Sequence, residues 1–216
     1  MPTTNSREIS ALRASLRLSD RQKKILVGSL LGDGCLIVNS GGTDYRFQAE
    51  QNEAHRGYLF WLYEEFKSWI ISAPKYHPKV RSWKFRTISH PELTGLAKEF
   101  YTEGKRVVPE RIMKLADDPI TLAVWAMDDG CRVGDRGFIL NTQSFTKLDN
   151  ERLRACLAIN FGLAHTSLHK DKTRYRIYIQ SHSLTRLHTL LAPLVHAEFV
   201  YKLPMPRRDL VLSKIG

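Results

Sequence analysis

The sequence has few cysteines and no long apolar run, and each absence argues against a class of protein. The three cysteines, Cys35, Cys131 and Cys156, form no Cys-x-x-Cys pair, so neither a disulfide framework nor a zinc ribbon is supported. The eight histidines follow no His-Glu-x-x-His or comparable ligand spacing. No run approaches the roughly 18 to 20 apolar residues of a membrane-spanning helix, and the polar start at 1–7 is unlike a secretory signal. We therefore expect a soluble, intracellular protein without a membrane partner.

Positive charge is what the sequence has in excess. Lys and Arg number 33 against 22 Asp and Glu, which gives a net charge of +11 over 216 residues. A hydrophobic content of 43% and this length allow one domain or two small ones. A basic folded chain attracts polyanions through steering and counterion release, so nucleic acid is the expected partner. A merely soluble basic protein is the alternative.

Two short apolar segments end in the same acidic pattern. Residues 26–34 read LVGSLLGDG and residues 122–130 read LAVWAMDDG, and a cysteine follows each. Both fit a helix that ends at an acid, Asp33 in the first segment and Asp129 in the second. Acids at equivalent ends of two similar helices are expected to meet at a pseudo-twofold axis, where paired carboxylates commonly hold divalent metal. A metal-dependent active site is the leading hypothesis.

Further matches follow these segments in the same order, which supports an internal duplication. Each half has a Ser-His pair after a strand-like stretch and then a basic residue just before a proline, at residues 89–90 and 105–109 and at residues 181–182 and 201–204. We predict an N-terminal arm, a first repeat, a linker and a second repeat, with the bounds 1–19, 20–104, 105–118 and 119–216.

Hydrophobic periodicity predicts an α+β fold in which the order helix, two strands, helix, two strands, helix is written twice. In the first half we expect helices at 20–33, 55–71 and 91–101, strands at 35–39, 45–51 and 80–88, and a turn at 40–43. In the second half we expect helices at 119–129, 147–161 and 183–195, strands at 138–144, 164–170 and 174–180, and a turn-rich segment at 130–137.

The strands alternate in polarity, so each antiparallel sheet should have one face covered by helices and one polar face. Arg and Lys bind phosphates and guanine edges, and Gln and Asn bind adenine edges, so such a face can read the major groove of duplex DNA. The candidate DNA-binding residues are Arg46, Gln48, Glu50, Gln51, Ser82, Lys84, Arg86, Asn141, Gln143, Arg174, Arg176, Tyr178 and Gln180. An ordinary solvent-facing sheet is the alternative, but several such strands in a strongly basic chain favour DNA.

These features resemble the LAGLIDADG homing endonucleases, specifically the single-chain, intron-encoded type with two motif copies. The resemblance covers residues 24–204 and includes both motif helices, FILNTQSFT at 138–146 and YKLP at 201–204. It implies αββαββα units related by pseudo-twofold symmetry, with two DNA-binding sheets forming a saddle and the motif helices at the interface. It also implies a monomer that breaks both strands of a long, nonpalindromic DNA site. The family's usual setting suggests a mitochondrion or chloroplast in a eukaryote, or otherwise the cytoplasm.

The resemblance also implies the metal site. Asp33 and Asp129, which match the acid that ends each motif, would bind Mg²⁺ at the scissile phosphates, with the backbone carbonyls of Gly32 and Asp128 as further ligands. Mn²⁺ or Ca²⁺ are alternative occupants. Metal-bound water would attack phosphorus in line. Because Asp128 and Asp129 are adjacent, either could be the ligand, and the register of the motif favours Asp129.

Lys202 matches the family's basic residue that orients water or stabilises the pentavalent phosphorus. Its counterpart in the first half is Arg106 by spacing, or Lys105 if the loop is one residue longer. Arginine stabilises charge but does not readily release a proton, so the two DNA strands are predicted to be cut at unequal rates. Contact with phosphate alone is the simpler alternative for these cations.

One departure from the family concerns the close packing of the motif helices through small residues. The first helix has Gly28 and Gly32, whereas the second has Val124 and Asp128 at the corresponding positions.

Two other functions are alternatives: an RNA maturase that assists splicing of its own group I intron, and a DNA-binding regulator without cleavage activity. The presence of Asp33, Asp129 and Lys202 favours the nuclease, because RNA binding does not require them.

Overall fold

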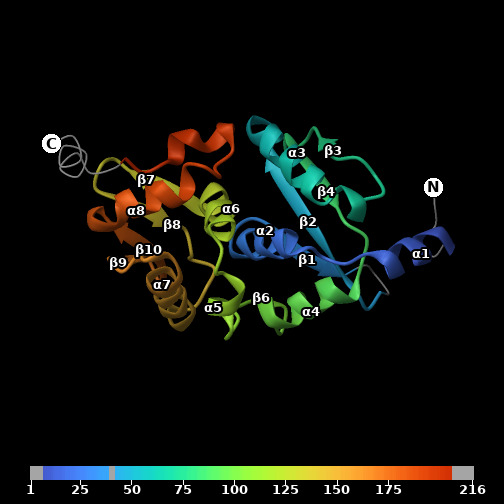
Figure 1. Cartoon of the computed structure of the whole chain (residues 1–216), viewed down its shortest axis with the longest axis horizontal. Coiled ribbons are helices and arrows are strands. Elements are labelled where there is room, and N and C mark those ends of the chain that lie inside the picture. Colours follow the sequence, from blue (N-terminus) through green and yellow to red (C-terminus); the bar gives the residue numbers. More distant parts are fainter. Residues whose placement is uncertain (1–6, 39–41, 206–216) are drawn as a thin grey trace. The chain divides into compact units, whose positions relative to one another are not determined.

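The computed structural model describes residues 7–38 and 42–205, and it confirms the predicted order of elements (Figure 1). The first αββαββα series consists of α2 (Asp20–Leu31), β1 (Cys35–Val38), β2 (Tyr45–Asn52), α3 (Arg56–Glu65), β3 (Lys75–His77), β4 (Ser82–Arg86) and α4 (Pro91–Phe100). The second consists of α6 (Pro119–Asp129), β7 (Gly130–Val133), β8 (Gly137–Leu140), α7 (Lys147–Phe161), β9 (Thr166–Asp171), β10 (Arg174–Gln180) and α8 (Ser181–Leu191). The remaining elements are α1 (Arg7–Ser15), β5 (Tyr101–Thr102), β6 (Lys105–Arg106), α5 (Ile112–Leu115), and the 3₁₀ helices η1 (Glu53–His55), η2 (Lys67–Trp69) and η3 (Ala197–Lys202).

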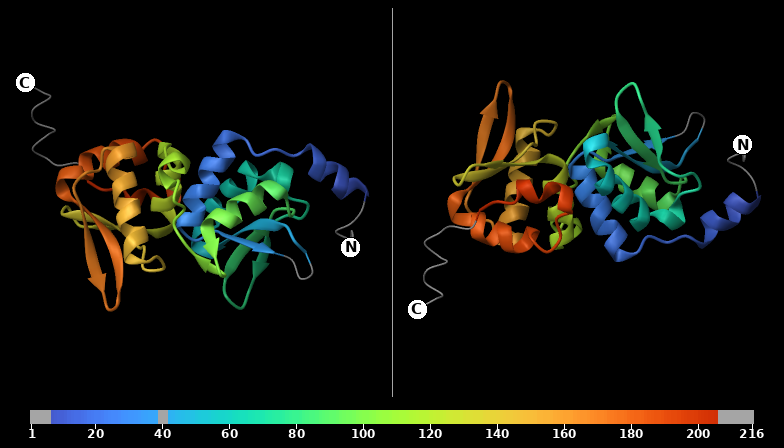
Figure 2. Two further views of the ribbon diagram at one scale, coloured as in Figure 1. Left: turned by 90° about the horizontal axis from the view of Figure 1, so that it is seen from below. Right: turned by 90° about the horizontal axis from the view of Figure 1, so that it is seen from above.

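Two four-stranded antiparallel sheets share one strand order, which is β1-β2-β4-β3 in one and β7-β8-β10-β9 in the other. The expected mixed fold with antiparallel sheets is thereby confirmed. The long hairpin of β9 and β10 is plain in Figure 2. Residues 40 and 41 of the predicted turn at 40–43 lie outside the described residues. None of the helices in the described ranges is long and apolar enough to cross a bilayer.

The chain forms two compact units that do not coincide with the two halves of the sequence. One unit comprises 1–23 and 34–98, and the other comprises 24–33 and 99–216. The second unit therefore contains most of the first motif helix. That helix is buried at every residue from Ile25 to Leu31, as expected for an apolar helix surrounded by protein. As a result, both motif segments belong to a single unit.

In the first unit, α3 covers the apolar face of the sheet. Phe47 of β2 is fully buried, and its ring centroid lies 5.2 Å from that of Phe66 and 5.9 Å from that of Phe85. The predicted helix at 55–71 is shorter than expected, because the chain leaves the α-helical conformation at Phe66 and continues as η2. The N-terminal arm contains α1, which is joined to this unit by the Arg13–Asp44 ion pair.

In the second unit, α7 and α8 contact the sheet through its apolar face, where Phe138, Leu140, Ile177 and Ile179 are fully buried. Helix α7 begins with a capping box, in which the side chain of Thr146 accepts from the Asp149 amide and that of Asp149 accepts from the Thr146 amide.

The segment 130–137, which we expected to be turn-rich, instead contains strand β7 directly after α6. Gly130 permits this abrupt change, because a Cβ there would collide with the Ala126 carbonyl and the Phe138 ring. A helix can therefore pass into a strand without an intervening loop.

Candidate active site and nucleic-acid interface

The two motif helices are in contact through the glycines of α2. A Cβ on Gly28 would lie 2.6 Å from the Thr121 carbonyl oxygen and 2.8 Å from Cβ of Val124, and a Cβ on Gly32 would collide with Asp128. The larger residues at the corresponding positions of α6 therefore lie against the glycines of α2. The departure from small residues in α6 is compensated because only one partner at each contact needs to be small.

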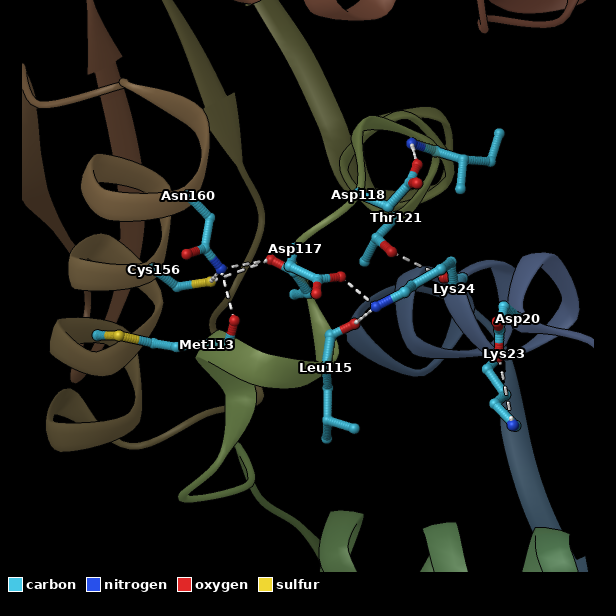
Figure 3. A network of polar contacts seen from close by, with 12 residues as sticks. Asp20, Lys23, Lys24, Met113, Leu115, Asp117, Asp118, Thr121, Cys156 and Asn160 are labelled. Carbon is cyan, nitrogen blue, oxygen red and sulfur yellow. Dashed lines mark hydrogen bonds and ion pairs between the residues drawn. The ribbon is translucent and has the colours of Figure 1, made fainter.

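A polar network fixes the start of this helix pair (Figure 3). The Thr121 hydroxyl donates to the Lys24 carbonyl oxygen at 3.0 Å, and the Lys24 ammonium forms an ion pair with Asp117. Asn160 of α7 donates to the carbonyl oxygens of Met113 and Ala116, at 2.7 and 2.8 Å. The segment that precedes α6 is thus held by both α2 and α7, which limits sliding of α2 along α6.

Asp33 and Asp129 are close enough to interact electrostatically. Asp33 follows the end of α2 and is exposed, whereas Asp129 is the last residue of α6 and is half-buried. Burial raises the pKa of Asp129, and repulsion by Asp33 raises it further, whereas Arg106 and Lys202 oppose the increase. The resulting pKa is about 7. Two carboxylates in this environment favour a bound cation or a shared proton.

The neighbouring acid, Asp128, has a different environment. Its Oδ2 accepts a hydrogen bond from the Asp33 amide at 3.3 Å, and its side chain packs against Gly32. The Asp128 carboxylate therefore links the ends of the two motif helices.

Two of the candidate basic residues, Arg106 and Lys202, each contact the end of one motif helix. Arg106 donates from Nη1 to the Gly32 carbonyl oxygen at 2.6 Å. Lys202 donates from Nζ to the Asp128 carbonyl oxygen at 3.3 Å and also to that of Met127. These bonds place a cation one residue before Asp33 and another one residue before Asp129.

Lys105 and Arg106 differ in their contact with the motif helices. Adjacent residues of a strand point to opposite faces, so only one of the two can point toward the motif helices from β6. Arg106 makes that contact, while Lys105 is exposed. Lys202 is half-buried, with Nζ 4.7 Å from the centre of the Phe199 ring. This burial lowers the pKa of its ammonium group.

The donor atoms suit a hard divalent cation bound by few protein ligands. The described residues contain no group of three or more His, Cys, Asp or Glu that could hold a metal. Ligands beyond the two carboxylates would therefore be carbonyl oxygens, water and phosphate, which Mg²⁺ commonly accepts. The carbonyls of Gly32 and Asp128 each accept a hydrogen bond, from Arg106 and Lys202 respectively.

Asn141, expected to bind DNA, makes a different contact in the structure. Its backbone amide and its side-chain Nδ2 both donate to the Asp129 carbonyl oxygen, each at 3.0 Å. Asn141 directly follows β8, so these two hydrogen bonds connect the end of β8 to the end of α6. No sequence signal distinguished this contact from base recognition.

The polar face of the first sheet carries most of the residues predicted for it. Arg46, Gln48 and Glu50 alternate on β2 with the buried Phe47 and Ala49. On β4 their neighbours Ser82, Lys84 and Arg86 lie on the same face. Glu50 accepts from Lys84 at 2.6 Å and from Ser82 at 2.5 Å.

Gln51 requires a correction. It shares the face of Phe47 and Ala49 and is only 8% exposed, so its side chain does not belong to the polar face. Strand β3, which the sequence did not predict, adds two residues to that face instead. They are Lys75, opposite Lys84, and His77, opposite Ser82.

The polar face of the second sheet includes Arg174, Arg176, Tyr178 and Gln180 on β10. Tyr178 stacks on His169, with ring centroids 4.3 Å apart and an interplanar angle of 10°. A Cβ on Gly137 would collide with the Tyr178 ring, so the glycine makes room for it.

Gln143 lies just beyond this sheet and contacts it. Its Nε2 donates to Asp171 at 3.0 Å, and its backbone carbonyl accepts from Arg174 at 3.3 Å.

Within the described residues, the buried Nε atoms of Arg46 and Arg176 have no hydrogen-bond partner. Such donors can be satisfied by an anionic or hydrogen-bonding ligand.

Comparison with known proteins gives an independent indication of function. The family described as "LAGLIDADG DNA endonuclease family" matches residues 23–187. The chain is 28% identical over 198 residues to cytochrome b mRNA maturase bI2 of Debaryomyces hansenii, which covers 86% of this chain and 74% of the relative. It is 27% identical over 201 residues to DNA endonuclease I-ChuI of Chlamydomonas applanata, covering 82% of this chain and 92% of the relative.

A solved structure shows the same fold. It is the homing endonuclease I-WcaI bound to its DNA recognition sequence, with a TM-score of 0.84 and 24% sequence identity. The similarity covers 95% of this chain and 96% of that one.

Proposed function

Since this chain belongs to the LAGLIDADG DNA endonuclease family, we propose that it makes a Mg²⁺-dependent double-strand break in a long, nonpalindromic DNA site. The observation that carries the proposal is the gathering of Asp33, Asp129, Arg106 and Lys202 around the ends of two packed helices. Carboxylates that can hold a metal and cations that can stabilise a phosphorane suit phosphodiester hydrolysis, because negative charge increases on the phosphate in the transition state.

Asp33 and Asp129 would hold the divalent cation, which supplies Lewis-acid stabilisation of the phosphate and of the entering and leaving oxygens. Arg106 and Lys202 then add positive charge where the pentavalent phosphorus carries extra negative charge. Asn141 fixes the backbone of Asp129, and Asp128 fixes that of Asp33. The protein thus contributes mainly by holding charged side chains in position before the reaction begins.

The polar faces of the two sheets are proposed to bind the DNA. Arg46, Arg86, Arg174 and Arg176 suit phosphates and guanine edges, and Gln48 suits adenine. The two faces differ in sequence, so one chain can recognise a site without twofold symmetry. A monomer therefore suffices, with the two repeats at 20–104 and 119–216 joined by a linker at 105–118.

The test uses Mg²⁺ and a DNA library that contains uninterrupted insertion sites, with Asp33→Asn and Asp129→Asn as variants. Wild type should cut both strands of a selected site, and each variant should bind the DNA without cutting it. Cleavage by either variant at the wild-type rate would refute the assigned roles. Omission of Mg²⁺, and replacement by Mn²⁺ or Ca²⁺, identifies the ion that supports cleavage.

RNA maturation is the second candidate function, because one of the similar proteins is named a maturase. A maturase would bind its own group I intron RNA and promote splicing whether or not Asp33 and Asp129 are present. Splicing assays with the same two variants therefore separate the functions. We place either activity inside the cell, in the organelle or cytoplasm that contains the target.

A further inference from the structure

The β3–β4 hairpin has two chemically different faces. Tyr76 and Trp83 are directly opposite each other, as are Lys75 and Lys84 one position along the strands. Because successive side chains alternate, the aromatic pair lies on one face and the lysine pair on the other. The aromatic face is the side of α3, since Trp83 contacts Phe60 of that helix.

The aromatic face is organised but incompletely covered. The rings of Tyr76 and Trp83 are 5.3 Å apart at 43°, and the guanidinium of Arg56 lies 4.7 Å from the centre of the Trp83 ring. The Trp83 indole donates to Glu53, which fixes the orientation of the ring. Tyr76 is nevertheless 39% exposed and Arg56 is exposed, whereas Phe85 farther along the same face is buried. The face thus changes from core to open surface toward the turn of the β3–β4 hairpin. This hairpin is the blue-green one that projects in Figure 2.

The turn of the hairpin places a cation in an unfavourable backbone conformation. Arg81 has a φ of 50°, in the left-handed region that glycine and asparagine adopt at lower cost. Its carbonyl accepts from the Glu53 amide at 2.9 Å, which holds the turn against η1. Residues 75–86 also contain five Lys or Arg and no acid.

We propose that the aromatic face of this hairpin is a binding site for an unpaired nucleotide of single-stranded nucleic acid. The base stacks on Tyr76, which Trp83 supports from behind, and the adjoining phosphates bind Arg81 and Arg56. Exposed aromatic rings among cations are the usual means of binding single strands, because every base has a stacking face. The site is on the opposite side of the hairpin from Lys84 and is therefore separate from the proposed duplex-binding face.

The test measures fluorescence anisotropy of labelled oligouridylate and oligothymidylate of about 12 nucleotides at roughly physiological ionic strength. Tyr76→Leu retains an apolar side chain but removes the stacking surface, and it should weaken binding about 5-fold or more. Tyr76→Phe should bind like wild type. The control is Tyr175→Leu, which removes a half-buried aromatic from the β9–β10 hairpin and should leave binding unchanged. Equal losses with both oligonucleotides indicate recognition of base and phosphate, and a loss with RNA alone indicates the 2′-hydroxyl.

Arg81→Gly separates binding from folding. Glycine relaxes the turn, so the thermal midpoint should stay the same or increase, whereas single-strand affinity and its salt dependence should fall. Unchanged affinity in both Tyr76→Leu and Arg81→Gly would overturn the proposal. Cleavage of duplex DNA by the same preparations tests the proposed nuclease independently and should be retained in both variants.

Discussion

Lys202 donates a hydrogen bond from Nζ to the carbonyl oxygen of Asp128, 3.3 Å away. Arg106 makes the equivalent bond, at 2.6 Å, to the carbonyl oxygen of Gly32. The two cations thus occupy corresponding positions at the two motif helices. They differ in chemistry, because arginine keeps its proton and spreads its charge over a plane, whereas lysine is a compact charge.

Unequal cutting of the two DNA strands is the first prediction. Wild type should accumulate nicked DNA, because we expect one scissile phosphate to face Arg106 and the other to face Lys202. Loss of either cation, in Arg106→Met or Lys202→Met, should slow cutting of one strand by about 10²-fold or more, the usual effect of removing a transition-state charge contact. Strand-specific end labels measure both rates. Equal slowing of both strands in each variant would contradict this assignment.

The conservative exchange Arg106→Lys provides the control. Lysine retains the positive charge but loses the planar donor geometry, so cutting should be affected less than in Arg106→Met. Lys105→Met should have little effect on cutting, because the exposed Lys105 does not make the contact to Gly32.

The spacing of apolar residues predicted the order of the elements. A strand with one buried face has an apolar residue at every second position, and a helix with one buried face has them at every third or fourth position. Strand β3 escaped prediction because its three residues are all exposed. Strand β7 escaped because its glycine and polar residues are typical of turns, and its conformation depends on the space that Gly130 provides for Phe138.

The candidate site was predictable where a motif fixed the register, as for Asp33 and Asp129. It was not predictable where a shift of one position along a strand moves a side chain to the opposite face. This applies to the choice between Arg106 and Lys105 and to Gln51. The contact of Asn141 with Asp129 also depends on pairing across the sheet, which sequence spacing does not reveal.

The carboxylate of Asp129 should destabilise the metal-free protein at high pH. Its pKa is raised to about 7 by burial and by Asp33, so the folded state favours the protonated form. The associated stabilisation is fully present below the unfolded pKa, near 4, and is lost as the pH rises through about 7. Asp129→Asn should therefore be more stable than wild type at pH 8, on the order of 2 kcal/mol after allowance for solvent screening.

Thermal unfolding in EDTA at pH 5 and pH 8 measures this effect, with about 2 to 4 °C expected per kcal/mol for a chain of this length. At pH 5 the gain should be less than half as large, because the carboxyl of the folded state is then still protonated. Asp135→Asn, which alters an exposed acid, should unfold like wild type at both values. An Asp129→Asn gain that is the same at both pH values would exclude titration of Asp129 as its cause.

The cysteines should differ in reactivity. Cys131 is exposed, whereas Cys156 is buried, and burial raises the pKa of its thiol to about 11. Because the thiolate is the reactive form, a thiol reagent at neutral pH should modify Cys131 rapidly and Cys156 only after unfolding. Mass spectrometry of partly modified protein identifies the order. Rapid modification of Cys156 in the folded chain would show that α7 opens locally.

The contact between the motif helices should be sensitive to a single methyl group. In Gly28→Ala the new Cβ would lie 2.6 Å from the Thr121 carbonyl oxygen, so α2 and α6 must separate. We expect a loss of about 1 to 3 kcal/mol in stability, and slower cleavage because Asp33 and Asp129 move with their helices. Gly95→Ala is the matched control, since Gly95 lies within α4 and a Cβ there meets nothing within 4 Å. That variant should gain about 0.5 to 1 kcal/mol and cut normally. If Gly28→Ala were as stable and as active as Gly95→Ala, close approach of the helices would not be what positions the two acids.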